Sequence, residues 1–114
     1  MFLEVHVQQA TFSPAQKVPI KLRFLVVQFG AQMKTTRPES TTSTQVRATL
    51  AFKMLPAQRP LLLVDAYCKG VKNDIYCGSV LVPTASLQPN IPHEQWYPLS
   101  SGGQVLLRLT CVSL

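Results

Sequence analysis

The stretch PLLLVDAYCKGVKNDIYCGSVLVPTASL, from Pro60 to Leu87, decides the fold class. It contains two mostly apolar runs, residues 61–67 and 76–82, separated by a polar segment and followed by Pro83. Apolar runs of this length that are bounded by proline and turn residues are typical of β-strands. The stretch therefore predicts two strands that are joined by a loop.

The same pattern repeats along the rest of the chain. Apolar and polar residues alternate in Phe2 to Val7, and again in Thr49 to Met54. Nine prolines and regularly spaced turn residues leave almost no room for a helix. Together these signals predict an all-β fold, an eight-stranded antiparallel β-sandwich that forms one domain over residues 1–114. The other strands are predicted at residues 20–29, 32–36, 95–99 and 104–112.

Composition limits the setting in which this domain works. Apolar residues make up 46% of the chain, which is enough for a packed core and argues against disorder. The apolar run from Leu61 to Val64 is too short to span a membrane. Glu4 and His6 interrupt the segment in which a secretion signal needs its apolar stretch. Three cysteines without a CxxC pair favour a reducing cytoplasm.

Several pieces of the sequence, in order, resemble the strands of C2 domains. FLEVHVQQATFSP (residues 2–14) resembles the opening strand, and RFLVVQFGAQMKTT (23–36) resembles the second and third strands. STQVRATLAFKM (43–54) resembles the fourth strand, and Gly78 with residues 80–83 fits the sixth. Trp96, Leu99 and the strand after Gly103 fit the C2 ending. The resemblance implies a C2-like sandwich.

Two further expectations follow from where the chain begins. Because it starts on the first shared strand, we expect type II topology, the second of the two circularly permuted C2 arrangements. The same start, at a methionine, suggests the N-terminal module of a longer scaffold protein.

The resemblance also locates the loops where C2 domains bind calcium, through about five aspartates. The first loop, TFSPAQKVPIKLR, contains no acid, and Leu22 occupies its aspartate position. In the third loop Tyr67 and Lys69 replace paired aspartates, and only Asp74 lies near a ligand position. Calcium needs six to eight oxygen ligands. We therefore expect calcium independence, no metal site and no cofactor, and we interpret Asp65 as an ordinary strand residue.

A net charge of +6 favours acidic partners, although solubility alone is an equally good reason for it. Many C2 domains carry lysines on a concave face, on the third and fourth strands, that binds acidic phospholipids. In the fourth strand, Arg47 and Lys53 share a parity and are expected on the same face. The six residues predicted to bind lipid or an acidic partner are Lys21, Arg23, Lys34, Arg37, Arg47 and Lys53.

The sequence offers little for catalysis or nucleic acid binding. His6 and His93 lie outside any catalytic motif, and the chain has no phosphate loop or nucleophile elbow. Cys68 and Cys77 flank the third loop, where they are expected to pack in the interior. The basic residues are not interleaved with aromatic ones as a nucleic acid platform requires. No enzyme activity and no nucleic acid partner are predicted.

Two functions stay open at this point. The first is a calcium-independent C2 module for protein–protein interaction or scaffolding, in a larger cytoskeletal, ciliary or trafficking protein. The alternative is calcium-independent binding of acidic phospholipid membranes through a basic concave face. Self-association through an edge strand is a further expectation. The expected location is the cytoplasm, in association with the cytoskeleton, a cilium or flagellum, or a membrane.

Overall fold

A computed structural model describes residues 1–12, 22–40, 45–55, 58–70 and 72–113. These residues form nine strands and no helix, so none of them lies in a helix that could cross a membrane. The strands are β1 (Phe2–Thr11), β2 (Leu22–Phe29), β3 (Gln32–Thr35), β4 (Glu39–Ser40), β5 (Gln45–Lys53), β6 (Leu61–Cys68), β7 (Ile75–Pro83), β8 (His93–Pro98) and β9 (Gln104–Val112).

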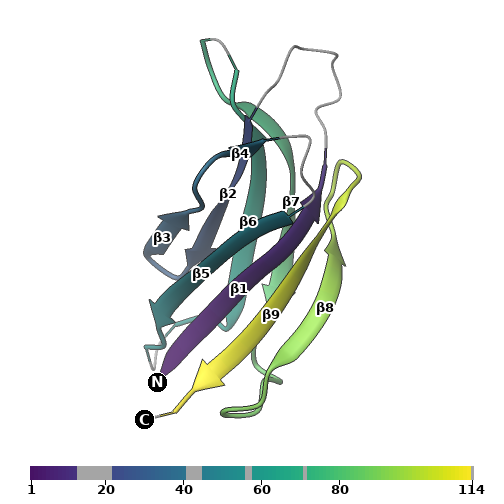
Figure 1. The fold of residues 1–114 in the computed structure, drawn as a ribbon. Coiled ribbons are helices and arrows are strands. Elements are labelled where there is room, and N and C mark those ends of the chain that lie inside the picture. The colour runs from purple at the N-terminus through teal and green to yellow at the C-terminus, as the bar shows by residue number, and fades with distance from the viewer. Residues whose placement is uncertain (13–21, 41–44, 56–57, 71, 114) are drawn as a thin grey trace.

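The strands form two sheets that face each other (Figure 1). One sheet has the order β5-β1-β9-β8, and the other has the order β3-β2-β6-β7 with the two-residue β4 beside β2. All pairs of named strands are antiparallel. The predicted eight-stranded antiparallel sandwich is confirmed, with β4 as an additional short strand. The first and last strands, β1 and β9, are neighbours in one sheet.

The core lies between the sheets and follows the alternation of the sequence. Leu3 and Val5 of β1 belong to one sheet and Leu62 and Val64 of β6 to the other, and all four are fully buried in one core cluster. A β-bulge between Val7 and Gln9 shifts the register of β1, after which even-numbered residues point inward. An edge-to-face contact between rings of the two sheets joins Phe29 to Phe52, with centroids 6.1 Å apart.

Several strand limits differ from the sequence prediction. The fourth long strand, β5, begins at Gln45 instead of Thr49, because hydrogen bonding to β1 extends it through polar residues. Strand β8 begins at His93, two residues earlier than predicted, because hydrogen bonding to β9 extends it. Residues 39–40, where the sequence predicts no strand, pair with β2 as strand β4. The added segments, residues 45–48 and 93–94, contain few large apolar side chains, so hydrophobic alternation does not mark these strand ends.

Candidate interaction surfaces

The connections 36–38, 69–74 and 99–103 lie at the upper end of the sandwich in Figure 1, called here the loop end. The chain has five carboxylates, and Glu4, Asp65 and Glu94 lie on strands away from this end. That leaves Glu39 and Asp74. Among the described residues, no three His, Cys, Asp or Glu side chains lie together where they could hold a metal ion. A calcium ion here would depend almost entirely on backbone and water oxygens.

The predicted basic residues do not form one face. Lys34 is on β3 in the five-stranded sheet, whereas Arg47 and Lys53 are on β5 in the other. The prediction that Arg47 and Lys53 share a face is confirmed, since they lie on the outer side of β5. Arg37 follows the end of β3, and Lys21 lies outside the described residues. The expectation of one basic concave face is wrong, because the third and fourth long strands belong to different sheets.

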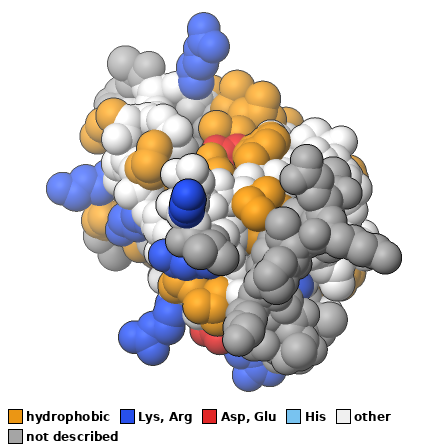
Figure 2. Space-filling view, turned by 90° about the horizontal axis from the view of Figure 1, so that it is seen from above, with side chains coloured by type: hydrophobic (Ala, Val, Ile, Leu, Met, Phe, Trp, Pro, Cys, Tyr) orange, Lys and Arg blue, Asp and Glu red, His pale blue; other side chains and the backbone are white. Residues whose placement is uncertain are grey.

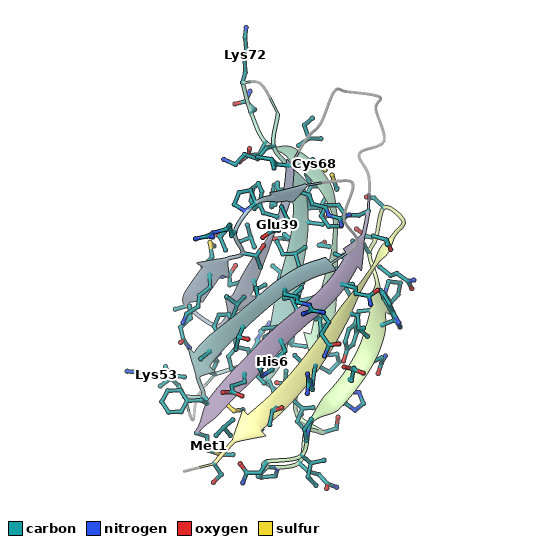
Figure 3. The ribbon with its side chains drawn as sticks, in the orientation of Figure 1. Met1, His6, Glu39, Lys53, Cys68 and Lys72 are labelled. Atoms are coloured by element: carbon teal, nitrogen blue, oxygen red, sulfur yellow. The ribbon has the colours of Figure 1, made fainter. Side chains whose placement is uncertain are left out.

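The figures also show the basic side chains on different parts of the surface. Seen from the loop end, Lys and Arg side chains project in several directions (Figure 2). Lys72 extends beyond the loop end, whereas Lys53 lies toward the opposite end (Figure 3). The ammonium nitrogen of Lys34 lies 5.5 Å from the ring centre of Phe52, so its stem covers the edge of the core.

Arg23 is the clearest correction to the predicted site, because only 3% of it is exposed. It pairs with Cys68 of β6 and shares the inward parity of Leu25. Its guanidinium lies 5.5 Å from the ring centre of Phe12, and within the described part of the chain its Nε and Nη2 have no hydrogen-bond partner. Burial lowers the pKa of Arg23 from its usual value, but a guanidinium stays charged at neutral pH. Arg23 is therefore a buried residue and no part of a basic surface.

Replacing Arg23 with methionine is expected to stabilise the domain. The change removes two unsatisfied buried N–H groups, which each cost about 1–3 kcal/mol, and keeps an unbranched apolar stem. Urea unfolding should show a higher free energy of unfolding. The exposed Arg37→Met variant is the control and should change stability by less than about 0.5 kcal/mol. A less stable Arg23→Met protein would contradict the account.

Cys68 and Cys77, which flank the third loop, pack in the interior as the sequence predicts, and they contact each other there. Both thiols are buried and free, with their sulfur atoms 3.2 Å apart. Burial, together with the contact with Cys77, raises the pKa of the Cys68 thiol to about 12, against the opposing effect of Arg23. Cys68 is therefore neutral at physiological pH and is a poor nucleophile.

The outer side of the four-stranded sheet carries polar side chains that pair with one another. His6 contacts Glu4 at 3.4 Å and Thr49 at 3.2 Å. Beside them is a hollow of about 320 Å³, where Arg108 lies 4.0 Å from Glu94. Sequence reasoning missed Arg108, although its alternation with Leu107 and Leu109 marks it as outward-facing. The hollow is lined by Gln8, Gln9, Arg47 and Arg108.

The outer side of the five-stranded sheet is different, because most of its side chains are apolar. We call this surface the apolar face. Met33 and Leu81 are 62% and 59% exposed on it. Asp65 is the only charged residue among the outward positions of β2, β3, β6 and β7. The apolar face consists of Phe24, Val26, Met33, Leu61, Leu63, Tyr67, Tyr76, Leu81 and Pro83, with Gln28, Thr35, Asp65 and Ser79 among them.

Aromatic rings pack against one another in the upper half of the apolar face. Phe24 and Tyr67 stack with centroids 5.5 Å apart, and Tyr76 meets Tyr67 edge-on at 5.8 Å. The hydroxyl group of Tyr76 donates a hydrogen bond of 2.6 Å to Ser79 Oγ. The Lys69 ammonium lies 5.8 Å from the ring centre of Phe24. Such ring pairs favour fixed geometries, so this half is preorganised.

Two hollows lie at the ends of the apolar face. The upper one, of about 340 Å³, is lined by Phe24, Thr35, Pro38, Lys69 and Asp74. The lower one, of about 210 Å³, is lined by Gln28, Gly30, Arg59, Leu61 and Leu63. The apolar face is therefore an uneven surface with a depression at each end.

Asp65 lies between these two ends. It stands opposite Val26 on β2 and Ser79 on β7. No hydrogen bond or ion pair joins its carboxylate to another side chain of the described residues. Partial burial raises its pKa above the ordinary value for aspartate. The face thus holds one partly buried carboxylate that has no counter-ion among the described residues.

The Asp65→Asn variant is expected to be more stable than the native domain at pH 7. The folded-state pKa of Asp65 is above the unfolded-state value, so ionisation weakens the fold as pH rises through that pKa. Below about pH 3.9, the unfolded-state value, both states are protonated and the difference between variants should vanish. Thermal unfolding from pH 3 to pH 7 measures it. An Asn variant that is less stable at pH 7 would show that Asp65 contributes to folding.

No family model and no curated protein matches this chain by sequence. Among solved structures, a C2 domain of plant extended synaptotagmin 1 is similar with a TM-score of 0.81 and 14% identity, over 99% of this chain and 95% of that one. Human GIVD cytosolic phospholipase A2 is similar with a TM-score of 0.80 and 14% identity. The match covers 96% of this chain but only 17% of the phospholipase.

A third similar structure is CC2D1B, with a TM-score of 0.79, 17% identity and coverage of 96% of this chain and 54% of that one. Identities this low establish the fold and leave the site open. The chain has the fold of a C2 domain, as the sequence resemblance indicated.

Proposed function

We propose that this C2 domain is a calcium-independent module for protein–protein interaction, within a larger cytoskeletal, ciliary or trafficking scaffold of the cytoplasm. The observation that supports the proposal is the apolar face, where Met33, Tyr76 and Leu81 are all more than half exposed. Monomeric proteins rarely expose large contiguous apolar patches, and such patches mark sites where a partner binds. The expected occupant is a segment of a partner protein.

The loop end supports the calcium-independent part of the proposal. Two carboxylates, Glu39 and Asp74, are few for a calcium ion, which takes six to eight oxygen ligands and binds more tightly as more of them are charged. Lys69 and Lys72 lie in the connection that holds Asp74, and their charges oppose a cation there.

Binding of acidic phospholipids is the second candidate, and the hollow that contains Arg47 and Arg108 favours it. Each basic residue near an anionic membrane contributes about 1 kcal/mol. Two such residues give weak attachment, because stable membrane binding takes a second signal. The scatter of Lys34, Lys53 and Lys72 over different surfaces adds little to one contact.

Pelleting with liposomes distinguishes the two candidates. The native domain is mixed with phosphatidylserine and phosphoinositide liposomes, in calcium or chelator, at low and physiological salt. We expect no pelleting at physiological salt in either condition. Pelleting that ignores calcium, falls with salt and is lost in Arg47→Glu would establish the lipid function instead. Pelleting that requires calcium would contradict the calcium-independent assignment.

A further inference from the structure

We propose that the apolar face binds a partner segment in which one arginine side chain lies between apolar side chains, with Asp65 as the counter-ion of that arginine. The inference rests on the proposed function and names the partner chemistry for the same surface. Its basis is the position of one unpaired carboxylate at the centre of exposed apolar and aromatic side chains.

The neighbours of Asp65 along the strands define what a bound segment touches. Two residues along β6 from Asp65, toward one end of the face, is Leu63, which lies opposite Leu81 of β7. Two residues along β6 toward the other end is Tyr67, which lies opposite Tyr76 of β7. At about 3.3 Å per residue, each pair lies roughly 7 Å from Asp65 along the strand. A segment that covers Asp65 therefore contacts aliphatic side chains on one side and aromatic rings on the other.

A partner that covers Asp65 must compensate its charge. Removing an unpaired carboxylate from water costs several kcal/mol, whereas a cation in contact with it recovers much of this cost. Arginine suits the position better than lysine, because its planar guanidinium binds a carboxylate through two hydrogen bonds. It can also stack on Tyr67 or Tyr76, the rings beside Asp65. The face therefore selects an apolar segment with one arginine at its centre.

Other occupants fit this arrangement less well. A second copy that packs face to face about a two-fold axis brings two Asp65 carboxylates together without a cation. An anionic membrane places its own negative charge against Asp65. The basic residues at the ends of the face, Lys69 and Arg59, lie in the two hollows and not beside the carboxylate.

Selection from a library of random peptides tests the proposal with the native domain as bait. The strongest peptides are then synthesised, and their dissociation constants are measured for the native domain, Asp65→Asn and Leu81→Lys. We expect an enriched arginine with apolar residues on both sides. Affinity should fall by about 30-fold or more in Asp65→Asn, as for the loss of one partner of a desolvated charge pair. Thermal unfolding verifies that each variant is folded.

A coupling measurement separates a direct contact from a general effect on the face. Replacing the peptide arginine with glutamine should weaken binding to the native domain but have little further effect on Asp65→Asn. Peptides that bind through Leu81 but are insensitive to Asp65 would overturn the arginine proposal and leave the proposed function standing. Peptides that bind native and Leu81→Lys domains equally, or no enrichment at all, would overturn both.

Discussion

Replacing Gly103 with alanine is expected to destabilise the domain strongly, by far more than the same change at Gly102. Both glycines have positive φ angles, +85° for Gly103 and +92° for Gly102, which cost alanine about 1–2 kcal/mol. A Cβ at Gly103 would also collide with the carbonyl oxygen of Thr11 and crowd Phe12. Overpacking of this kind adds about 1–3 kcal/mol.

Gly102 is the matched control for this prediction, because a Cβ there meets no atom of the described residues within 4 Å. Urea unfolding of the two alanine variants should therefore give a free energy difference equal to the cost of the collision. The contact links the β8–β9 turn to the end of β1, so the experiment measures how tightly the loop end is closed. Equal destabilisation by the two variants would show that the contact is absent in solution.

The second large effect is expected from Leu81→Lys, which should remove binding of the selected peptides while leaving the fold intact. Leu81 is 59% exposed, so its replacement costs the unbound domain little. When a partner covers the apolar face, however, the lysine must be desolvated beside apolar groups. Central interface positions of this kind commonly cost 2 kcal/mol or more, which is roughly 30-fold in affinity.

Leu55→Lys is the control for this prediction, because Leu55 is 58% exposed but lies in the connection after β5. The two variants change the same residue type at the same exposure and differ only in location. We expect native affinity for Leu55→Lys by isothermal titration calorimetry. Comparable losses in the two variants would mean that added charge, and not its position, weakens binding.

Local alternation was enough to predict most of the fold. Leu3, Val5 and Val7 repeat every second residue, so both the strand and its buried side could be predicted. The sheet that a strand joins could not be predicted in this way, because it depends on pairing between residues far apart in sequence. The prediction that Lys34 and Arg47 share one face is wrong for this reason, since β3 and β5 are edge strands of different sheets.

The candidate sites were harder to predict than the fold. Arg23 was assigned to the surface by its charge, although its parity with Leu25 and Val27 places it in the core. The apolar face had one sequence signal, the run from Leu61 to Val64, which does not alternate as a solvated strand does. The sequence does not predict the aromatic part of this face, because Phe24, Tyr67 and Tyr76 lie on three strands that only the sheet brings together.

Mapping a selected arginine peptide on the domain by amide chemical shifts in two-dimensional NMR tests most directly whether the apolar face is the interaction surface. The account predicts that perturbed amides cluster in β2, β6 and β7 around Asp65, and that calcium leaves these shifts unchanged. Perturbations confined to the loop end, or to the outer side of the four-stranded sheet around Arg47 and Arg108, would contradict it.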